Sequence, residues 1–112
     1  MKKSSYFLGK ETEVKDLGQG LKRQILAHAP MLMMVKVYFE EGAVGAAHHH
    51  PHRQVTYVES GFFEVSIGAE TQKLSKGDGF FVAPDEVHGV VCLEAGALID
   101  VFTPAREDFK KS

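Results

Sequence analysis

The hydrophobic positions of this chain repeat with a period of two over most of its length. In residues 31–40, every odd-numbered position from Met31 to Phe39 is apolar, so one face of the segment is entirely hydrophobic. This alternation is typical of a half-buried β-strand. Similar short segments, rich in β-branched and aromatic residues, are predicted to be strands, and they cover residues 21–27, 54–59, 62–67, 71–74, 80–83, 89–93 and 97–103.

Turn-forming residues separate these segments. Gly68 and Ala69 fit a two-residue hairpin with glycine first, residues 76–79 read as a tight loop, and residues 94–96 fit a slightly longer hairpin. Only residues 107–111, which follow a proline, have a helical pattern. Many short strands without internal helices predict an all-β fold, an antiparallel sandwich or barrel with a short C-terminal helical turn.

The composition limits the size and the partners of the protein. With 112 residues, 44% of them hydrophobic, residues 1–112 should form a single domain, with the core barrel at about 20–104. The 13 basic and 15 acidic residues nearly cancel without long runs, so we expect a small-molecule ligand and neither nucleic acid nor a membrane. The single cysteine, Cys92, excludes an internal disulfide, and the first residues lack the apolar stretch of an export signal. We therefore expect a cytoplasmic protein.

Histidines provide the candidate chemistry. His48 and His50 are two residues apart, so on an extended strand both imidazoles would leave the same face and could converge on one cation. Gln54 could add an oxygen after a short turn, and His88 a third nitrogen from another strand. Zn, Ni, Fe and Mn all accept such a mixed ligand set. The alternative is a solvated histidine-rich loop that binds metal only casually.

The other three histidines are predicted not to be ligands. His49 has the opposite parity to the pair, and His28 stands alone in the sequence. The turn around Pro51 hides the direction of His52, so the participation of His52 stays open.

The spacing of the candidate ligands resembles the first signature of the cupins. It reads Gly42, five residues, His48, one residue, His50, three residues, Gln54, six residues and Gly61. Gln54 stands where the general cupin pattern has glutamate, and the second signature is matched only loosely, by Gly77 and His88. The resemblance implies a jelly-roll barrel of six to eight strands that holds one divalent transition metal per chain, with His48, His50, Gln54 and His88 as its ligands.

A closer resemblance extends over about residues 18–109. Residues 33–37, 54–61 and 98–109 are similar to the KdgF group of pectin-degradation cupins, in which a glutamine is the expected ligand. The resemblance implies a metal-dependent enzyme that converts 4,5-unsaturated uronates, released by pectin or alginate lyases, into linear 4-deoxy-5-keto-uronates. It also implies that Asp100, Phe102 and Arg106 are site residues beside the metal.

This chemistry suits the residue types. Opening the unsaturated ring requires a proton at C4 and water at C5, and Asp100 shares a strand face with Leu98 and Phe102. If that face points inward, desolvation should raise the pKa of Asp100, while a nearby cation would oppose the shift. The planar fork of Arg106 matches a carboxylate, and Phe102 would line the sugar ring.

Each assignment has an alternative. Asp100 could accept backbone hydrogen bonds, Arg106 could form a surface salt bridge with the acidic residues that follow it, and Phe102 could be an ordinary core residue. The fold also accommodates a small cupin dioxygenase with histidine-bound iron, or a non-catalytic module that binds a sugar or anion.

The even-numbered face of residues 31–40 predicts a further partner. Leu32, Met34 and Tyr38 on this face need cover, so we expect a homodimer.

Overall fold

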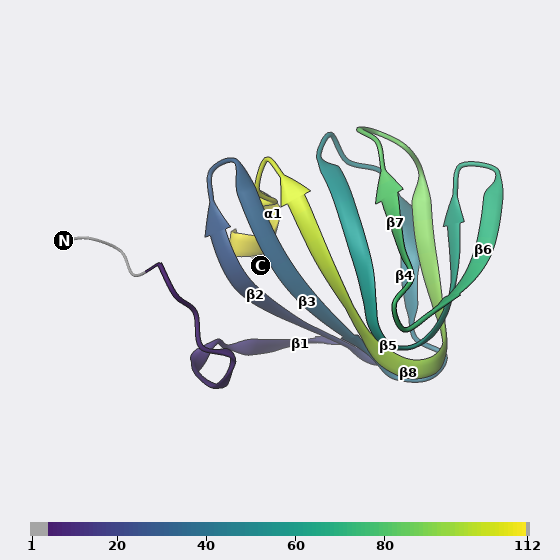
Figure 1. The fold of residues 1–112 in the computed structure, drawn as a ribbon, viewed down its shortest axis with the longest axis horizontal. Coiled ribbons are helices and arrows are strands. Elements are labelled where there is room, and N and C mark those ends of the chain that lie inside the picture. The colour runs from purple at the N-terminus through teal and green to yellow at the C-terminus, as the bar shows by residue number, and fades with distance from the viewer. Residues whose placement is uncertain (1–4, 112) are drawn as a thin grey trace.

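Eight β-strands form a rolled antiparallel sheet in the computed structural model, which describes residues 5–111 (Figure 1). The strands are β1 (Val14–Gly18), β2 (Leu21–Ala29), β3 (Leu32–Phe39), β4 (Val44–His48), β5 (Arg53–Ile67), β6 (Glu70–Ser75), β7 (Gly79–Val82) and β8 (His88–Thr103). A 3-10 turn, η1 (Gly9–Glu11), precedes β1, and a short helix, α1 (Glu107–Lys111), follows β8. The all-β fold and the C-terminal helical turn predicted from the sequence are therefore confirmed.

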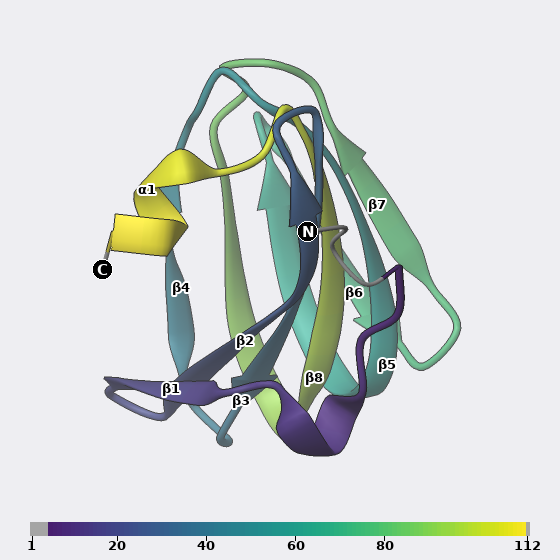
Figure 2. The same cartoon turned by 90° about the vertical axis from the view of Figure 1, so that its left-hand side faces the viewer.

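The two longest strands divide the molecule into two layers. The second half of β8 pairs with β3 and with the first half of β5, and β2, β1 and β7 extend this layer. The first half of β8 pairs with β4 and with the second half of β5, which also pairs with β6. Both long strands bend at the lower end in Figure 1, so the layers face each other and the space between them opens at the upper end. The loop between β4 and β5 and the loop between β7 and β8 lie close together at that open end (Figures 1 and 2).

The bends of β5 and β8 correct two predictions from the sequence. Residues 54–59 and 62–67 are one strand, as are residues 89–93 and 97–103, so the hairpin predicted at residues 94–96 is wrong. The register between the two strands shifts three times between Val58 and Phe63, which marks bulges. Gly61 has φ +89°, and a Cβ on Gly96 would overlap the carbonyl of Ser60. Glycine at these positions therefore permits a close crossing of two continuous strands, not a turn.

The inward faces of the strands form two apolar clusters. Met33, Val35 and Phe39 on β3 are buried as the alternation predicted, whereas Met31 precedes the strand and is 69% exposed. One cluster joins β3, β5 and β8 and consists of Phe39, Ala43, Val58, Phe63, Val65, Cys92 and Leu98. The second lies nearer the open end and consists of Met33, Val35, Phe102 and Ala105.

The remaining turns agree with the prediction, but the N-terminal part does not. Gly68 and Ala69 join β5 to β6, and Gly77 adopts φ +97° in the loop before β7. η1, β1 and β4 were not predicted as elements. β1 pairs with β2, and the buried amide of Gln24 donates hydrogen bonds to the carbonyls of Gly9 and Thr12 at 3.0 and 3.2 Å. β1 thus adds a strand to the sheet on the N-terminal side of β2.

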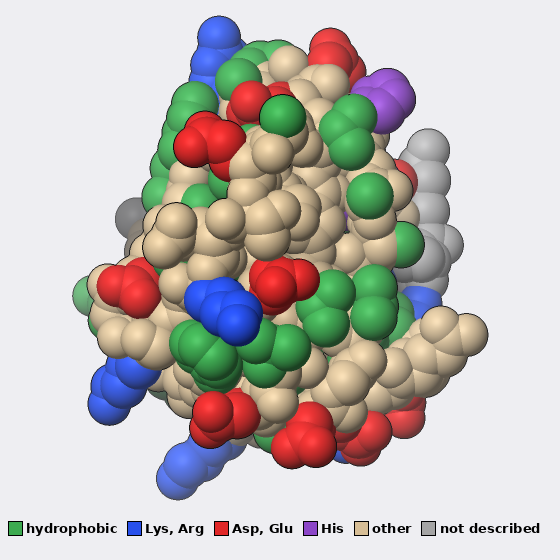
Figure 3. Space-filling model, turned by 90° about the vertical axis from the view of Figure 1, so that its right-hand side faces the viewer, with side chains coloured by type: hydrophobic (Ala, Val, Ile, Leu, Met, Phe, Trp, Pro, Cys, Tyr) green, Lys and Arg blue, Asp and Glu red, His purple; other side chains and the backbone are tan. Residues whose placement is uncertain are grey.

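The outer surface of the protein has mixed character. Figure 3 shows acidic, basic and apolar side chains interspersed over the face that lies on the right in Figure 1. Among residues 5–111, no helix is long and apolar enough to cross a membrane.

Candidate metal site

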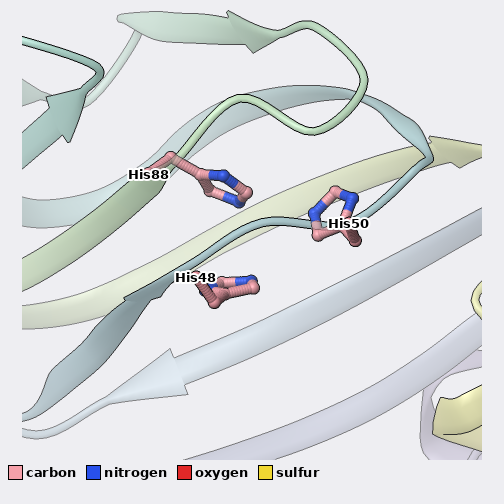
Figure 4. Close-up of side chains that lie close together, drawn as sticks. All are labelled: His48, His50 and His88. Carbon is pink, nitrogen blue, oxygen red and sulfur yellow. The ribbon is translucent and has the colours of Figure 1, made fainter.

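Three histidine rings converge at the open end of the molecule. His48 ends β4, His50 follows in the loop, and His88 is the first residue of β8, opposite His48 in the strand register. One nitrogen atom from each ring lies within 4.8 Å of the others, and Figure 4 shows the rings gathered around one point. The expectation that His48 and His50 share a strand is wrong, because β4 ends at His48; the chain turns there and still brings the two rings together.

Backbone carbonyls set the orientation of two of these rings. Nδ1 of His48 lies 2.8 Å from the carbonyl oxygen of Ala46, and Nδ1 of His88 lies 2.9 Å from that of Glu86. A carbonyl can only accept a hydrogen bond, so each Nδ1 carries the proton. The Nε2 atoms of His48 and His88 therefore keep their lone pairs, which is how metal-binding histidines are commonly held.

The third ring has a buried nitrogen without a partner. Nε2 of His50 donates a hydrogen bond to Oε1 of Gln54 at 3.1 Å, because an amide oxygen can only accept. Nδ1 of His50 is buried and has no hydrogen-bond partner among the described residues. Leaving such an atom unsatisfied is unfavourable, so the ring suits a site completed by a bound ion.

Burial favours the neutral form of two of the imidazoles. It lowers the pKa of His50 to about 4, and the positive charge of Arg106 contributes to the shift. Burial also lowers the pKa of His88. Both rings are therefore neutral at pH 7, as metal ligands must be. Three imidazoles with an adjacent amide oxygen fit a divalent transition ion.

A hydrogen-bonded chain links this cluster to Asp100. Nε2 of Gln54 donates to Oγ1 of Thr56 at 2.8 Å and to Oδ1 of Asp100 at 3.3 Å. The hydroxyl of Thr56 in turn donates to the same Oδ1 at 2.6 Å. With its amide nitrogen held in this way, Gln54 directs its carbonyl oxygen toward His50.

Asp100 shares a face of β8 with Leu98 and Phe102, as the alternation predicted, and that face points inward. Burial raises the pKa of Asp100 to about 6, although the hydrogen bonds from Thr56 and Gln54 and the positive charge of Arg106 oppose the shift. Near neutral pH the carboxyl group can therefore either give or accept a proton, which is the property that acid–base catalysis needs.

Phe102 and Arg106 extend the site toward the C-terminus. Phe102 is a buried core residue, and its ring lies edge-on to that of His50 with the centroids 5.8 Å apart. The guanidinium of Arg106 lies 5.4 Å from the centroid of Phe102 and forms a two-pronged ion pair with Asp108. The structure thus contains both features that the sequence had left as alternatives, the core role of Phe102 and the salt bridge of Arg106.

A cavity of about 230 Å³ lies between the two layers beside these groups. Its walls include His48, His88, Gln54, Asp100 and Phe102. A larger groove of about 650 Å³ lies between β1, the start of β2 and the end of β3, and contains none of the clustered histidines. The smaller cavity is the one where acid–base and metal-binding groups meet.

The structure also shows where the three histidines lie that were not predicted to be ligands. His28 and His49 are exposed, and His49 lies 3.7 Å from Asp85. His52 is close to the cluster, with its ring centroid 5.3 Å from that of His50. Thr56, which connects Gln54 to Asp100, was missed; its position on the inner face, two residues after Gln54, was the available signal.

Comparison with known proteins agrees with this architecture. The family model of the cupin domain matches residues 35–102, which is more than half of the chain. The chain belongs to the cupin family.

Individual cupins resemble this chain over nearly its whole length. The chain is 47% identical to the pectin degradation protein KdgF of Dickeya dadantii over 106 residues, which cover 93% of this chain and 96% of the relative. The crystal structure of an RmlC-like cupin from Shewanella frigidimarina has a TM-score of 0.93 and 48% identity, and 96% of each chain is covered. The structure of KdgF from a Halomonas species has a TM-score of 0.90 and 43% identity over 94% of this chain and 99% of that one.

Proposed function

We propose that this protein is a metal-dependent enzyme of pectin or alginate breakdown that converts 4,5-unsaturated uronates to linear 4-deoxy-5-keto-uronates. The observation that carries the proposal is the hydrogen-bonded chain from the histidine cluster through Gln54 and Thr56 to Asp100, whose pKa is raised to about 6. The similarity to KdgF over nearly the whole chain supports the same substrate class.

The histidines and Gln54 would hold the metal. In our proposal His48, His50, His88 and Gln54 are the ligands of one divalent ion, which would replace the hydrogen bond between His50 and Gln54. Ni, Zn, Mn and Fe all accept such ligands. A bound ion of this kind would act as a Lewis acid that polarises a nearby oxygen. Because all four ligands are uncharged, they would leave its positive charge undiminished.

The other residues would act on the sugar directly. Asp100 would transfer the proton involved at C4, since its carboxyl group is balanced between its two forms near pH 6. Arg106 would bind the uronate carboxylate, and Phe102 would form the apolar wall beside the ring. Water addition at C5 then gives a hemiketal, which opens to the linear keto acid.

The test follows the unsaturated monosaccharide. Purified protein loaded with each of the four metals should remove the conjugated ultraviolet absorbance much faster than spontaneous opening does. His50→Ala should lose both metal content and rate, whereas His49→Ala, at an exposed neighbouring position, should keep both. A wild-type rate equal to the spontaneous rate rules the proposal out, and oxygen uptake in step with substrate loss would identify a dioxygenase instead.

We also propose that the chain acts as one cytoplasmic domain and as a homodimer. The strand register aligns Met34, Val101, Val55 and Phe81 across β3, β8, β5 and β7 on the outer face. Val55 and Phe81 are 54% and 56% exposed, so this row offers an apolar surface that a second copy could cover. Light scattering should give the mass of two chains, and the mass of one chain would contradict the dimer.

A further inference from the structure

Arg106 is held on three sides by its neighbours. Its Nε and Nη2 atoms donate to the two carboxylate oxygens of Asp108 at 3.0 and 2.8 Å. The rings of Phe102 and Phe109 lie against the guanidinium, with centroids 5.4 and 4.3 Å from its central carbon. The Arg106 side chain is 11% exposed, so it lies against these two rings and does not extend into solvent.

Phe109 itself is anchored to the barrel. Nη2 of Arg23 on β2 donates to the carbonyl of Phe109 at 3.2 Å, and the Arg23 guanidinium lies 4.3 Å from the centroid of the Phe109 ring. Phe102 and Phe109 also meet edge-on at 5.6 Å. The helix α1 is thus tied to β2 and to β8, the strand that carries Asp100 and Phe102.

The ion pair with Asp108 occupies only one edge of the Arg106 guanidinium. Arginine has five N–H donors in a planar fork, and the Asp108 contacts use one from Nε and one from Nη2. The remaining edge, formed by Nη1 and the second proton of Nη2, retains the geometry that matches a carboxylate. Arg106 also lies close to the site, because the Phe102 ring that it contacts at 5.4 Å lies edge-on to the ring of His50 at 5.8 Å.

We infer that Asp108 is a positioning residue: it orients Arg106 so that the free edge of the guanidinium receives the substrate carboxylate, and it thereby sets the preference for uronates over neutral sugars. This inference rests on the proposed function. Asp108 itself is 60% exposed, whereas the Arg106 side chain that it holds is 11% exposed. Its contribution lies in removing the rotational freedom of a long side chain before the ligand arrives.

The neighbouring helix position offers a matched control. Glu107 lies on the same short helix and pairs with Lys110 at 3.1 Å. Asp108→Asn and Glu107→Gln each remove one negative charge from α1, but only the first changes the two-pronged contact with Arg106. An effect of net charge alone would therefore appear in both variants.

The experiment combines kinetics with binding on the metal-loaded protein. For Asp108→Asn we expect KM for the unsaturated uronate to rise about tenfold, the scale of one oriented charge-assisted hydrogen bond, with kcat within about twofold of wild type. By calorimetry, the preference for D-galacturonate over D-galactose should fall by a similar factor. Glu107→Gln should leave both quantities unchanged, and Asp108→Glu should restore part of the preference.

The outcomes separate this inference from the proposed function. Equal effects of Asp108→Asn and Glu107→Gln, or an unchanged galacturonate preference in Asp108→Asn, overturn the role of Asp108 while the activity of the wild type stands. A wild type that fails to open the ring but binds galacturonate selectively through Asp108 overturns the activity and keeps the positioning role. A wild type that neither opens the ring nor prefers galacturonate overturns both.

Discussion

Replacing Asp100 by asparagine should separate the catalytic from the structural effect of this carboxyl group. Asparagine has nearly the same shape, and its side-chain oxygen can still accept the hydrogen bond from Thr56. It cannot ionise or transfer a proton. We therefore expect Asp100→Asn to lose at least about a hundredfold in kcat, the usual scale of general acid–base catalysis, while substrate affinity changes little.

The same substitution should change stability in a pH-dependent way. The pKa of Asp100 is raised from the ordinary 3.8 to about 6, which is roughly two units, and each unit corresponds to about 1.4 kcal/mol. The folded protein therefore holds this proton more tightly than the unfolded chain does. The stabilisation is complete below about pH 4 and is lost as the pH rises through about 6, so its full range is about 3 kcal/mol.

Urea unfolding of the metal-free proteins from pH 4 to pH 8 measures this range. The lowered pKa values of His50 and His88 act in the opposite direction, because they make the folded protein more stable as the pH rises. Both proteins share these histidines, so their contribution largely cancels in the difference between wild type and variant. The variant should gain about 3 kcal/mol relative to wild type between pH 4 and pH 8.

Two results would refute this reasoning. If the difference in unfolding free energy between wild type and Asp100→Asn is the same at every pH, the pKa of Asp100 is not raised. If the variant turns over substrate at the wild-type rate, Asp100 transfers no proton in the reaction. Retained affinity with no activity in either protein would instead identify a binding module.

Three further predictions follow from the site and the strand crossing. Removing the metal with a chelator should lower Tm, because an ion at a hundred times its Kd stabilises the fold by about 2.7 kcal/mol; an unchanged melting curve by calorimetry would speak against a bound ion. Thr56→Val removes a hydrogen bond that favours the charged form of Asp100, so the limb of the pH–rate profile that reports Asp100 should move up by roughly one pH unit. An unchanged limb would show that Thr56 does not tune the pKa of Asp100. Gly96→Ala should lower the free energy of unfolding by more than about 2 kcal/mol in urea titrations, because the added Cβ would overlap the Ser60 carbonyl. The control Gly9→Ala, where a Cβ meets nothing within 4 Å, should change this free energy by no more than about 0.5 kcal/mol. Equal effects of the two substitutions would contradict the close crossing of β5 and β8.

Part of the fold could be predicted because its signals are local. The alternation in residues 31–40 marks β3 because one face is buried and the other is not. β1 carries no such signal, since Val14 and Leu17 lie on opposite faces and both are exposed. Gly96 was misread because a glycine in a tight crossing and a glycine in a turn look alike until the partner strand is known.

The site, too, contains some residues that the sequence could indicate and others whose role depends on the fold. The histidine pair and Gln54 could be identified from their spacing within one segment, and His88 from its place at the head of a strand. Thr56 is an ordinary strand residue by propensity, and only its cross-strand neighbour Asp100 gives its hydroxyl a role. The ion pair between Asp108 and Arg106 likewise depends on how α1 places these residues beside Phe102.

The long pairing of β5 with β8 also has a kinetic consequence. Its register runs from Arg53 opposite Thr103 to Ile67 opposite His88, so residues about twenty to fifty positions apart must find each other before either layer is complete. Chains dominated by such distant contacts fold slowly, on the scale of milliseconds to seconds. Until that search ends, a newly made chain offers a cation only the local histidines of residues 48–52, without His88, so tight capture of the ion should report the late arrival of β8.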